Sequence, residues 1–79
     1  MSSALLARLK KGGSVGLRHM GLDGETAKTI AEFLRDNQTI TTLGLFDNRI
    51  GVLGAAAMAG ALRDNQTLTT LRLGHNRIG

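Results

Sequence analysis

Two histidines and one aspartate recur at a fixed interval and are the residues best suited to acid–base or metal chemistry. His19, Asp47 and His75 are each separated by 28 residues. A histidine–carboxylate–histidine row could relay protons or bind a metal ion. If the three lie on adjacent parallel strands, the histidines are about 10 Å apart, which is too far for comfortable shared ligation. Since no serine or cysteine nucleophile occupies the neighbouring columns, we expect a polar rim with no catalytic residue, no metal site and no cofactor.

One aromatic residue interrupts the surface pattern of the same segments. Phe46 has Arg18 and Gly74 at the corresponding positions, so the repeated pattern does not require a ring there. An exposed aromatic side chain flanked by Arg18 and Arg72 has the composition of a binding hot spot. The alternative, equally supported, is that Phe46 folds over a strand end and packs locally. The candidate protein-binding residues are Arg18, Thr42, Phe46, Asp47, Thr70, Arg72 and His75.

These positions belong to a segment that occurs twice. Residues 34–51 read LRDNQTITTLGLFDNRIG and residues 62–79 read LRDNQTLTTLRLGHNRIG, with 14 of 18 positions identical. A fixed period between about 20 and 50 residues is the signature of a solenoid. Such a fold presents an extended surface that suits holding a partner better than enclosing a reaction.

The hydrophobic pattern predicts which elements carry these residues. Alternating apolar residues at 15–17, 43–45 and 71–73 predict three short strands. Apolar residues at i, i+3, i+4 and i+7 predict a helix between successive strands, and a helical crossover makes those strands parallel. The predicted inward faces are Ala27, Ile30, Ala31 and Leu34 in one helix, and Ala55, Met58, Ala59 and Leu62 in the next.

Helix ends are also predicted from residue type. We expect Asp23 to cap the first of these helices, and Asn37 and Asn65 to adopt the left-handed turn that ends each one. The opening MSSALLARLKKGG predicts a short helix that Ser3 caps and Gly12 stops. Its basic, acid-free composition also suits a targeting or membrane-surface segment. Because its leucines are in register with the repeat, a cap helix is the better interpretation.

The spacing of leucine, isoleucine and asparagine resembles the leucine-rich repeat. The pattern is Ile40-x-x-Leu43-x-Leu45-x-x-Asn48-x-Ile50, repeated as Leu68-x-x-Leu71-x-Leu73-x-x-Asn76-x-Ile78. The period and the helical crossovers resemble the ribonuclease-inhibitor subfamily, which also supplies recognition arms of NOD-like immune receptors and of many bacterial effectors. The resemblance implies an α/β leucine-rich repeat solenoid, with parallel strands on the concave face and helical crossovers on the convex face. It also implies that Asn48 and Asn76 have a structural role, satisfying backbone groups at the bends.

We expect a single leucine-rich repeat domain over residues 1–79. Residues 1–22 are an N-terminal cap-like unit, because Met20 stands where the family has asparagine. Residues 23–50 form one repeat, and residues 51–79 form a repeat that lacks its following helix. We interpret this ending as part of a longer array, and the alternative is that another chain covers the open end.

Composition limits the partners. The chain has no cysteine, which excludes disulfides and thiolate metal sites and favours an intracellular location. No stretch approaches the roughly 20 apolar residues that span a bilayer, so we expect no membrane partner. The net charge of +4 comes from the N-terminal segment. With no tyrosine, no tryptophan and two phenylalanines, base-stacking platforms are nearly absent, and we expect no nucleic-acid partner.

An uncharged run covers the second expected helix. Residues 50–62 read IGVLGAAAMAGAL, and an uncovered apolar helix face usually marks a contact. The simpler interpretation is a long array that tolerates this exposure. Self-association through this helix or through the open C-terminal end is the alternative. The expected outward positions are Leu53, Ala56, Ala57, Gly60 and Ala61.

Together these features predict a non-enzymatic protein-binding scaffold that presents a concave leucine-rich repeat surface to a protein partner of unknown identity. Two alternatives stay open. The chain is a recognition segment of a larger regulatory effector whose catalytic or adaptor domain lies elsewhere, or it is a self-assembling structural module. The expected location is the cytoplasm, or the host cytoplasm for a secreted effector.

Overall fold

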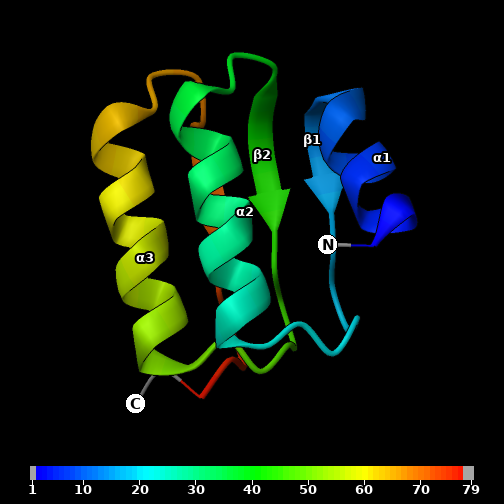
Figure 1. The fold of residues 1–79 in the computed structure, drawn as a ribbon, viewed down its shortest axis with the longest axis vertical. Coiled ribbons are helices and arrows are strands. Elements are labelled where there is room, and N and C mark those ends of the chain that lie inside the picture. The colour runs from blue at the N-terminus through cyan, green and yellow to red at the C-terminus, as the bar shows by residue number, and fades with distance from the viewer. Residues whose placement is uncertain (1, 78–79) are drawn as a thin grey trace.

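Helices and strands alternate along the chain in the computed structural model, which describes residues 2–77. The elements are α1 (Ser3–Lys11), β1 (Gly13–Gly16), α2 (Gly24–Asp36), β2 (Ile40–Gly44), α3 (Gly51–Asp64) and β3 (Thr70–Arg72). In Figure 1, α3 and α2 run side by side, β2 and β1 lie to their right, and α1 lies beside β1. The expected order of helix and strand is confirmed. Ile78, the last position of the repeat pattern, lies outside the described residues.

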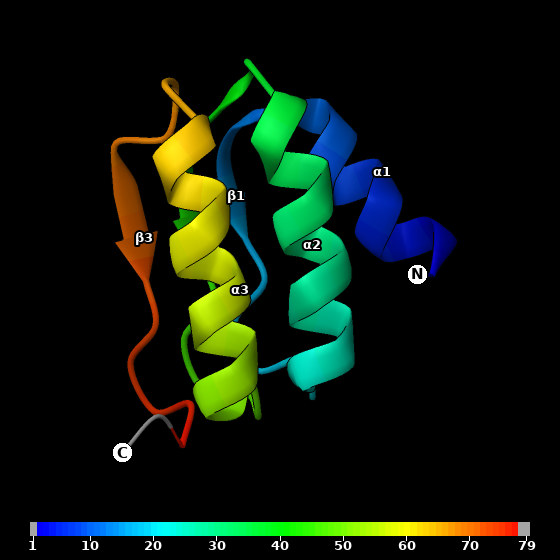
Figure 2. The same ribbon diagram turned by 60° about the vertical axis from the view of Figure 1, so that its left-hand side comes forward.

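The sheet formed by the described residues is parallel, with the strand order β1-β2-β3. Thr42 in β2 pairs with Ser14 in β1 and with Thr70 in β3, and each of these partners is 28 residues away. β1 and β2 are each followed by a helix that returns the chain to the start of the next strand, which parallel pairing requires. Figure 2 shows α2 and α3 on the same side of this sheet. The predicted α/β architecture is therefore confirmed.

The core lies between the sheet and α2. Leu43 and Leu45 are fully buried, and so is Ile40 at the start of β2. The predicted inward face of α2 is confirmed, since the four buried residues of this helix are Ala27, Ile30, Ala31 and Leu34. Beside β1, α1 buries Leu5 and Leu9 and ends at Gly12 with φ 75°, as expected.

Two helices begin with a side-chain cap. The Asp23 carboxylate accepts a hydrogen bond from the Thr26 N–H at 2.9 Å, which confirms the predicted cap of α2. This hydrogen bond lowers the pKa of Asp23 below its ordinary value of 3.8. In α1 the predicted cap, Ser3, is wrong by one residue. Ser2 is extended (φ −69°, ψ 154°) and its hydroxyl accepts from the Leu5 N–H at 3.2 Å, whereas Ser3 is already helical.

The ends of α2 and α3 differ from the sequence-based expectation. Asn37 and Asn65 are extended, with φ −77° and −92°, so the predicted left-handed turn was wrong. The side-chain oxygen of Asn37 accepts hydrogen bonds from the next backbone N–H groups of Thr39 and Ile40. The side-chain oxygen of Asn65 likewise accepts hydrogen bonds from the backbone N–H groups of Thr67 and Leu68. Asparagine therefore ends each helix through its side chain and directs the chain into the strand.

The inward face of α3 was also wrongly predicted in part. Met58 is buried as expected, but Leu62 is 38% exposed, and Ala61, expected outside, is fully buried. The buried residues of α3 are Gly54, Met58 and Ala61. The buried faces of α2 and α3 differ because different elements pack against the two helices. Among the described residues, α3 packs on the stripe of α2, and no helix packs on the corresponding positions Ala55, Ala59 and Leu62.

The outer surface of α3 is apolar, as the uncharged run predicts. Val52 is 63% exposed and Leu53 is 85% exposed, whereas Ala57 packs partly against the core. Over residues 2–77, no helix combines the length and the apolar character that crossing a bilayer requires.

Candidate functional site

The bend that follows β2 is built around a buried asparagine. Asn48 is 5% exposed and bonds the backbone of two successive units. Its Oδ1 accepts from N–H groups of the first unit, and its Nδ2 donates to carbonyl oxygens of both units. The donors are Met20 (2.9 Å) and Leu22 (3.0 Å), and the acceptors are Leu17 (2.9 Å), Leu45 (3.0 Å) and Phe46 (3.3 Å).

Asn76 repeats this arrangement one unit later. It is 2% exposed, and its Oδ1 accepts from the Ile50 N–H at 3.3 Å. Its Nδ2 donates to the carbonyl oxygens of Leu45 (2.6 Å), Leu73 (3.0 Å) and Gly74 (3.0 Å). Both asparagines therefore bond backwards, to the unit that precedes them in the chain. These contacts position the side chains that emerge just before each bend.

The histidine–aspartate–histidine row occupies one backbone conformation in all three units. His19, Asp47 and His75 have φ of 55°, 61° and 54°, in the left-handed region. Aspartate, asparagine and histidine are several-fold enriched among the non-glycine residues that tolerate this region. The residue types of the row are thus accounted for by the turn, without a catalytic demand.

The three residues of this row line one depression, but their side chains do not all bond to one another. His19 Nδ1 lies 2.9 Å from Asp47 Oδ2, and both side chains are largely exposed. His75 instead contacts the Phe46 ring edge-on, with ring centroids 5.0 Å apart. Among residues 2–77, no group of three or more histidine, cysteine or acidic side chains is arranged to hold a metal ion. The pairing of His19 with Asp47 alone was not predicted from the sequence.

The side of the sheet that faces away from α2 and α3, here called the strand face, carries the candidate binding residues. Phe46 is half-buried at the end of β2. Its ring lies against Gly74, where a Cβ would stand 2.9 Å from two ring carbons. Arg18 lies on the ring, with its guanidinium carbon 5.5 Å from the centroid, within cation–π range. Phe46 therefore combines the two sequence-based interpretations: it packs locally and remains partly accessible.

A shallow depression of about 410 Å³ opens beside the Phe46 ring. Arg18 and Arg72, which the sequence predicted to flank the aromatic side chain, both line this depression. Thr42 and Thr70 pair in register in the adjacent strands and are partly exposed. The residues that line the depression are Gly16, Arg18, Gly44, Phe46 and Arg72.

A second depression, of about 280 Å³, adjoins the first at Gly16. Here α1 contributes Arg8, whose Nη1 donates to the Gly16 carbonyl oxygen at 3.1 Å. The lining also includes Lys11 from the last turn of the helix. Neither residue was singled out as a binding residue from the sequence. The available signal was the basic, acid-free composition of the opening segment, which was interpreted as part of a helix that caps the repeats.

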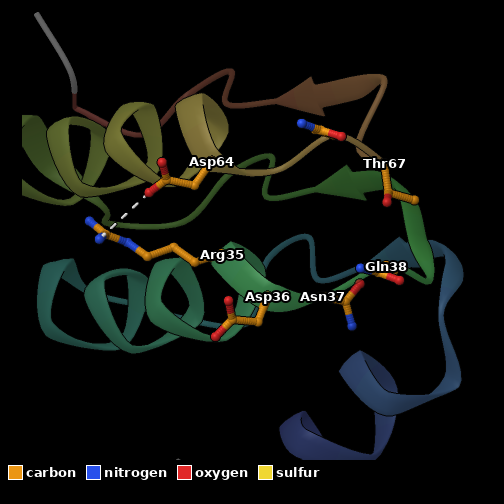
Figure 3. Close-up of a pocket in the computed structure, with 7 residues that line it drawn as sticks. Arg35, Asp36, Asn37, Gln38, Asp64 and Thr67 are labelled. Carbon is orange, nitrogen blue, oxygen red and sulfur yellow. Dashed lines mark ion pairs between the residues drawn. The ribbon is translucent and has the colours of Figure 1, made fainter.

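A polar depression of about 700 Å³ lies where α2 and α3 end (Figure 3). Arg35 and Asp64 form an ion pair across it at 3.7 Å, with both side chains more than half exposed. Such a pair contributes little binding or stability on its own. The lining residues are Arg35, Asp36, Asn37, Gln38, Asp64, Gln66 and Thr67.

Comparisons with known proteins agree with this architecture. A family profile described as "Leucine Rich repeat" matches residues 36–59 and 64–79. A solved structure described as leiomodin-1 actin-binding site 2 superposes with a TM-score of 0.79 and 32% sequence identity. The superposition covers 98% of this chain and 49% of that chain, so the present chain spans about half of the similar structure. A search of curated proteins gave no match.

Proposed function

The chain belongs to the leucine-rich repeat family, and on this premise we propose that it is a non-enzymatic protein-binding scaffold. The observation that carries the proposal is Phe46, a half-buried ring with Arg18 over it, on a strand face of small residues. An aromatic anchor beside arginine is the composition of a binding hot spot. The proposed contact residues are Arg18, Thr42, Phe46, Asp47, Thr70, Arg72 and His75.

The proposal includes the subfamily, the division of the chain and its location. The 28-residue offset between paired strands and the helical crossovers support a ribonuclease-inhibitor-like repeat. Burial of Leu5 and Leu9 beside β1 supports a cap-like unit over residues 1–22, followed by repeats over 23–50 and 51–79. The absence of cysteine supports a cytoplasmic location.

The surroundings of the His19–Asp47 pair support a binding role over a catalytic one. The pair lies in a depression of about 390 Å³. Covalent catalysis by such a pair requires a nucleophilic side chain within hydrogen-bond reach of the base. Among the described residues, the lining has no serine, threonine, cysteine or lysine; it consists of His19, Gly21, Asp47, Asn48, Arg49, His75 and Arg77.

The experiment that tests the scaffold compares the two faces of the molecule. A photoreactive amino acid replaces Thr42 on the strand face or Lys28 on the exposed side of α2, and cross-linked proteins are identified by mass spectrometry. We expect a saturable adduct from position 42 and none from position 28. The purified partner is then titrated with Phe46→Ala, which should weaken binding by at least about 1 kcal/mol.

The control for that titration is the fold of the variant. Phe46→Ala should retain the far-ultraviolet circular dichroism of the wild type, since the ring lies on the surface of the sheet. Cross-linking from position 28 alone, or unchanged binding by Phe46→Ala, would assign recognition to the helical side instead.

Actin is the first named partner to test. The similar leiomodin-1 structure is described as an actin-binding site, and it shares 32% identity with the chain over nearly its whole length. We propose an actin-like protein surface as the partner, tested by titrating fluorescent chain with purified monomeric actin. Saturable binding that Phe46→Ala weakens would support actin. No binding at the highest soluble actin concentration would exclude it and leave the scaffold proposal to the cross-linking result.

Self-association is a second candidate, supported by apolar side chains outside the core. Leu53 is 85% exposed on the outer surface of α3, and Leu62 is 38% exposed on a side of α3 that no other helix of residues 2–77 covers. Light scattering across a concentration series measures the mass in solution. If the wild type dimerises through the side of α3 that carries Leu62, Leu62→Lys should restore the monomer. If it dimerises through the outer surface of α3, Leu53→Lys should restore the monomer.

A further inference from the structure

Charge is separated between the two sides of the molecule. Five of the six acidic residues lie in α3 or in α2 and its cap, and only Asp47 lies at a bend after a strand. Seven of the ten basic residues lie in α1, in β3 or in the segments that follow the strands. The five acidic residues are Asp23, Glu25, Glu32, Asp36 and Asp64; the seven basic residues are Arg8, Lys10, Lys11, Arg18, Arg49, Arg72 and Arg77.

The depression on the strand face and the one beside α1 share Gly16, and the two together are here called the basic groove. The groove is lined by four cations and by no acidic residue: Arg8, Lys11, Arg18 and Arg72. Over residues 2–77, none of these four makes an ion pair with a carboxylate, whereas Arg35 on the helical side does. Four exposed cations without internal counter-charges are complementary to an anionic ligand.

Two of the four cations are already held in place. Arg8 is fixed by its hydrogen bond to the Gly16 carbonyl oxygen, and Arg18 by its position over the Phe46 ring. A long side chain that is ordered before binding loses less conformational entropy when the ligand arrives. Each guanidinium retains N–H donors in a fork that matches the two oxygens of a carboxylate.

We propose that this basic groove binds an extended acidic segment of a protein partner, with carboxylates on Arg18 and Arg72 and an apolar side chain against Phe46. The inference rests on the proposed scaffold function and specifies the chemistry of its partner. Arg72 on β3 is level with Gly16 on β1, two strands away, and Arg18 lies two residues beyond Gly16, so the backbone positions of the two arginines are about 12 Å apart. That distance matches four residues of an extended peptide at about 3.3 Å per residue, and side chains four residues apart lie on the same face of the peptide.

The groove suits a peptide better than a nucleic acid. Binding of single strands relies on exposed aromatic faces on which bases stack. The Phe46 ring is covered by Arg18 and flanked by His75 and Gly74, so it offers a side rather than an open platform. The other phenylalanine, Phe33, packs against the core.

The test uses a short fluorescent peptide with two glutamates four residues apart and a leucine midway between them, so that all three side chains lie on one face. Its controls are the same peptide with lysines in place of the glutamates, and a single-stranded oligouridylate. Binding is followed by fluorescence anisotropy and by backbone amide shifts of ¹⁵N-labelled chain. We expect only the acidic peptide to bind. It should shift Gly16, Gly44 and Gly74 on the strand face and leave Gly54 and Gly60 in α3 unchanged.

Paired variants assign the binding to the groove. Arg18→Ala combined with Arg72→Ala should weaken binding of the acidic peptide by at least about tenfold. Lys28→Ala combined with Arg63→Ala removes the same formal charge from the helical side and should leave the affinity within about twofold. Equal losses in the two double variants would reduce the effect to net charge and overturn the inference. Tighter binding of oligouridylate at the same glycines would overturn it in favour of a nucleic acid.

The scaffold proposal and this inference fail separately. A partner found by cross-linking from position 42 that is weakened by Phe46→Ala, but not by the Arg18 and Arg72 variant, supports the scaffold and overturns the acidic ligand. Loss of binding in both variants supports both proposals.

Discussion

The middle and last units of the chain contain nearly the same sequence in two different surroundings. Leu34 is 1% exposed, whereas its counterpart Leu62 is 38% exposed. The strand side chains follow the same rule, because Leu43 is fully buried and Leu71 is only partly buried. Burial of an apolar side chain here is therefore decided by the next unit, which covers it, and not by the residue or its local pattern.

The asparagines at the bends break this rule in an informative way. Asn48 and Asn76 are both almost completely buried, although they belong to the same two units as the leucines. Each asparagine bonds to the unit before it, which is present in both cases. Apolar packing in this fold thus depends on the following neighbour, and the polar bend depends on the preceding one.

The largest expected effect comes from truncating two leucines at equivalent positions of the middle and last units. Leu43→Ala should lower the free energy of unfolding by about 2–5 kcal/mol, because it leaves a cavity in a fully buried site. Leu71→Ala should lower it by less than half of that, since its side chain is already partly in contact with water. Urea denaturation followed by circular dichroism measures both. If Leu43→Ala does not fold, Leu43→Val provides the same comparison at about 1 kcal/mol.

Equal losses at the two leucines would mean that the last unit is as well covered as the middle one, for example by self-association. Repeating the denaturation at several protein concentrations distinguishes this case, because an associated state is stabilised by mass action.

The second test replaces each of the two bend asparagines with alanine. Asn48→Ala should cost about 1–3 kcal/mol, because it leaves buried backbone groups of two units without partners. Asn76→Ala should cost less but remain measurable, since some of its bonds are only partly buried. The measurement is the same urea denaturation. A negligible loss at Asn76 alongside a large one at Asn48 would show that the bonds to the preceding unit are too weak to define the last bend.

The third test uses a buried and a partly exposed glycine of α3, Gly54 and Gly60. A Cβ at Gly54 would lie 3.1 Å from the Cβ of Ala27 and 2.5 Å from Ile50 Cγ2, so Gly54→Ala should destabilise the chain by about 1–3 kcal/mol. A Cβ at Gly60 would approach only a nitrogen of Arg35, at 3.6 Å. Gly60→Ala should therefore stabilise the helix by up to about 1 kcal/mol. Thermal melting temperatures that move in the same direction for both variants would contradict the packing of α3 against α2.

The smallest effect concerns the caps of the two helices. Asp23 caps α2, whereas α3 begins after Ile50 without a side-chain cap. The pKa of Asp23 is lowered by its hydrogen bond to the Thr26 N–H, so the cap stabilises the fold above the ordinary value of 3.8 and loses this contribution as pH falls through the lowered value. Asp23→Asn keeps the cap and removes the titration. Its melting temperature should fall less than that of the wild type between neutral and strongly acidic pH, and identical pH profiles would refute this role.

Much of the fold was predicted from local patterns, because these patterns carry its physical cause. Alternating apolar residues place Leu43 and Leu45 on the buried side of a strand, and the helical stripe places Ile30 on the buried side of a helix. The cap at Asp23 needs only a short polar side chain ahead of an amphipathic run. The location of Phe46 beside Arg18 also follows from aligning the repeats, since equivalent residues of parallel strands lie side by side.

The remaining features depend on which neighbour reaches which side chain, and only the tertiary structure decides that. The exposed side of α3 was misassigned because Ala61 is buried by α2, while Leu62 has no helix over it among the described residues. Arg8 joins the basic groove because α1 packs beside β1 and brings the Arg8 guanidinium to the Gly16 carbonyl oxygen. Sequence by itself determined the period, the strands, the helices and the residues that face each way within one unit. Contacts between units determined burial, the His19–Asp47 pair and the basic groove, since periodicity records a residue's local preference and carries no information about what packs against it.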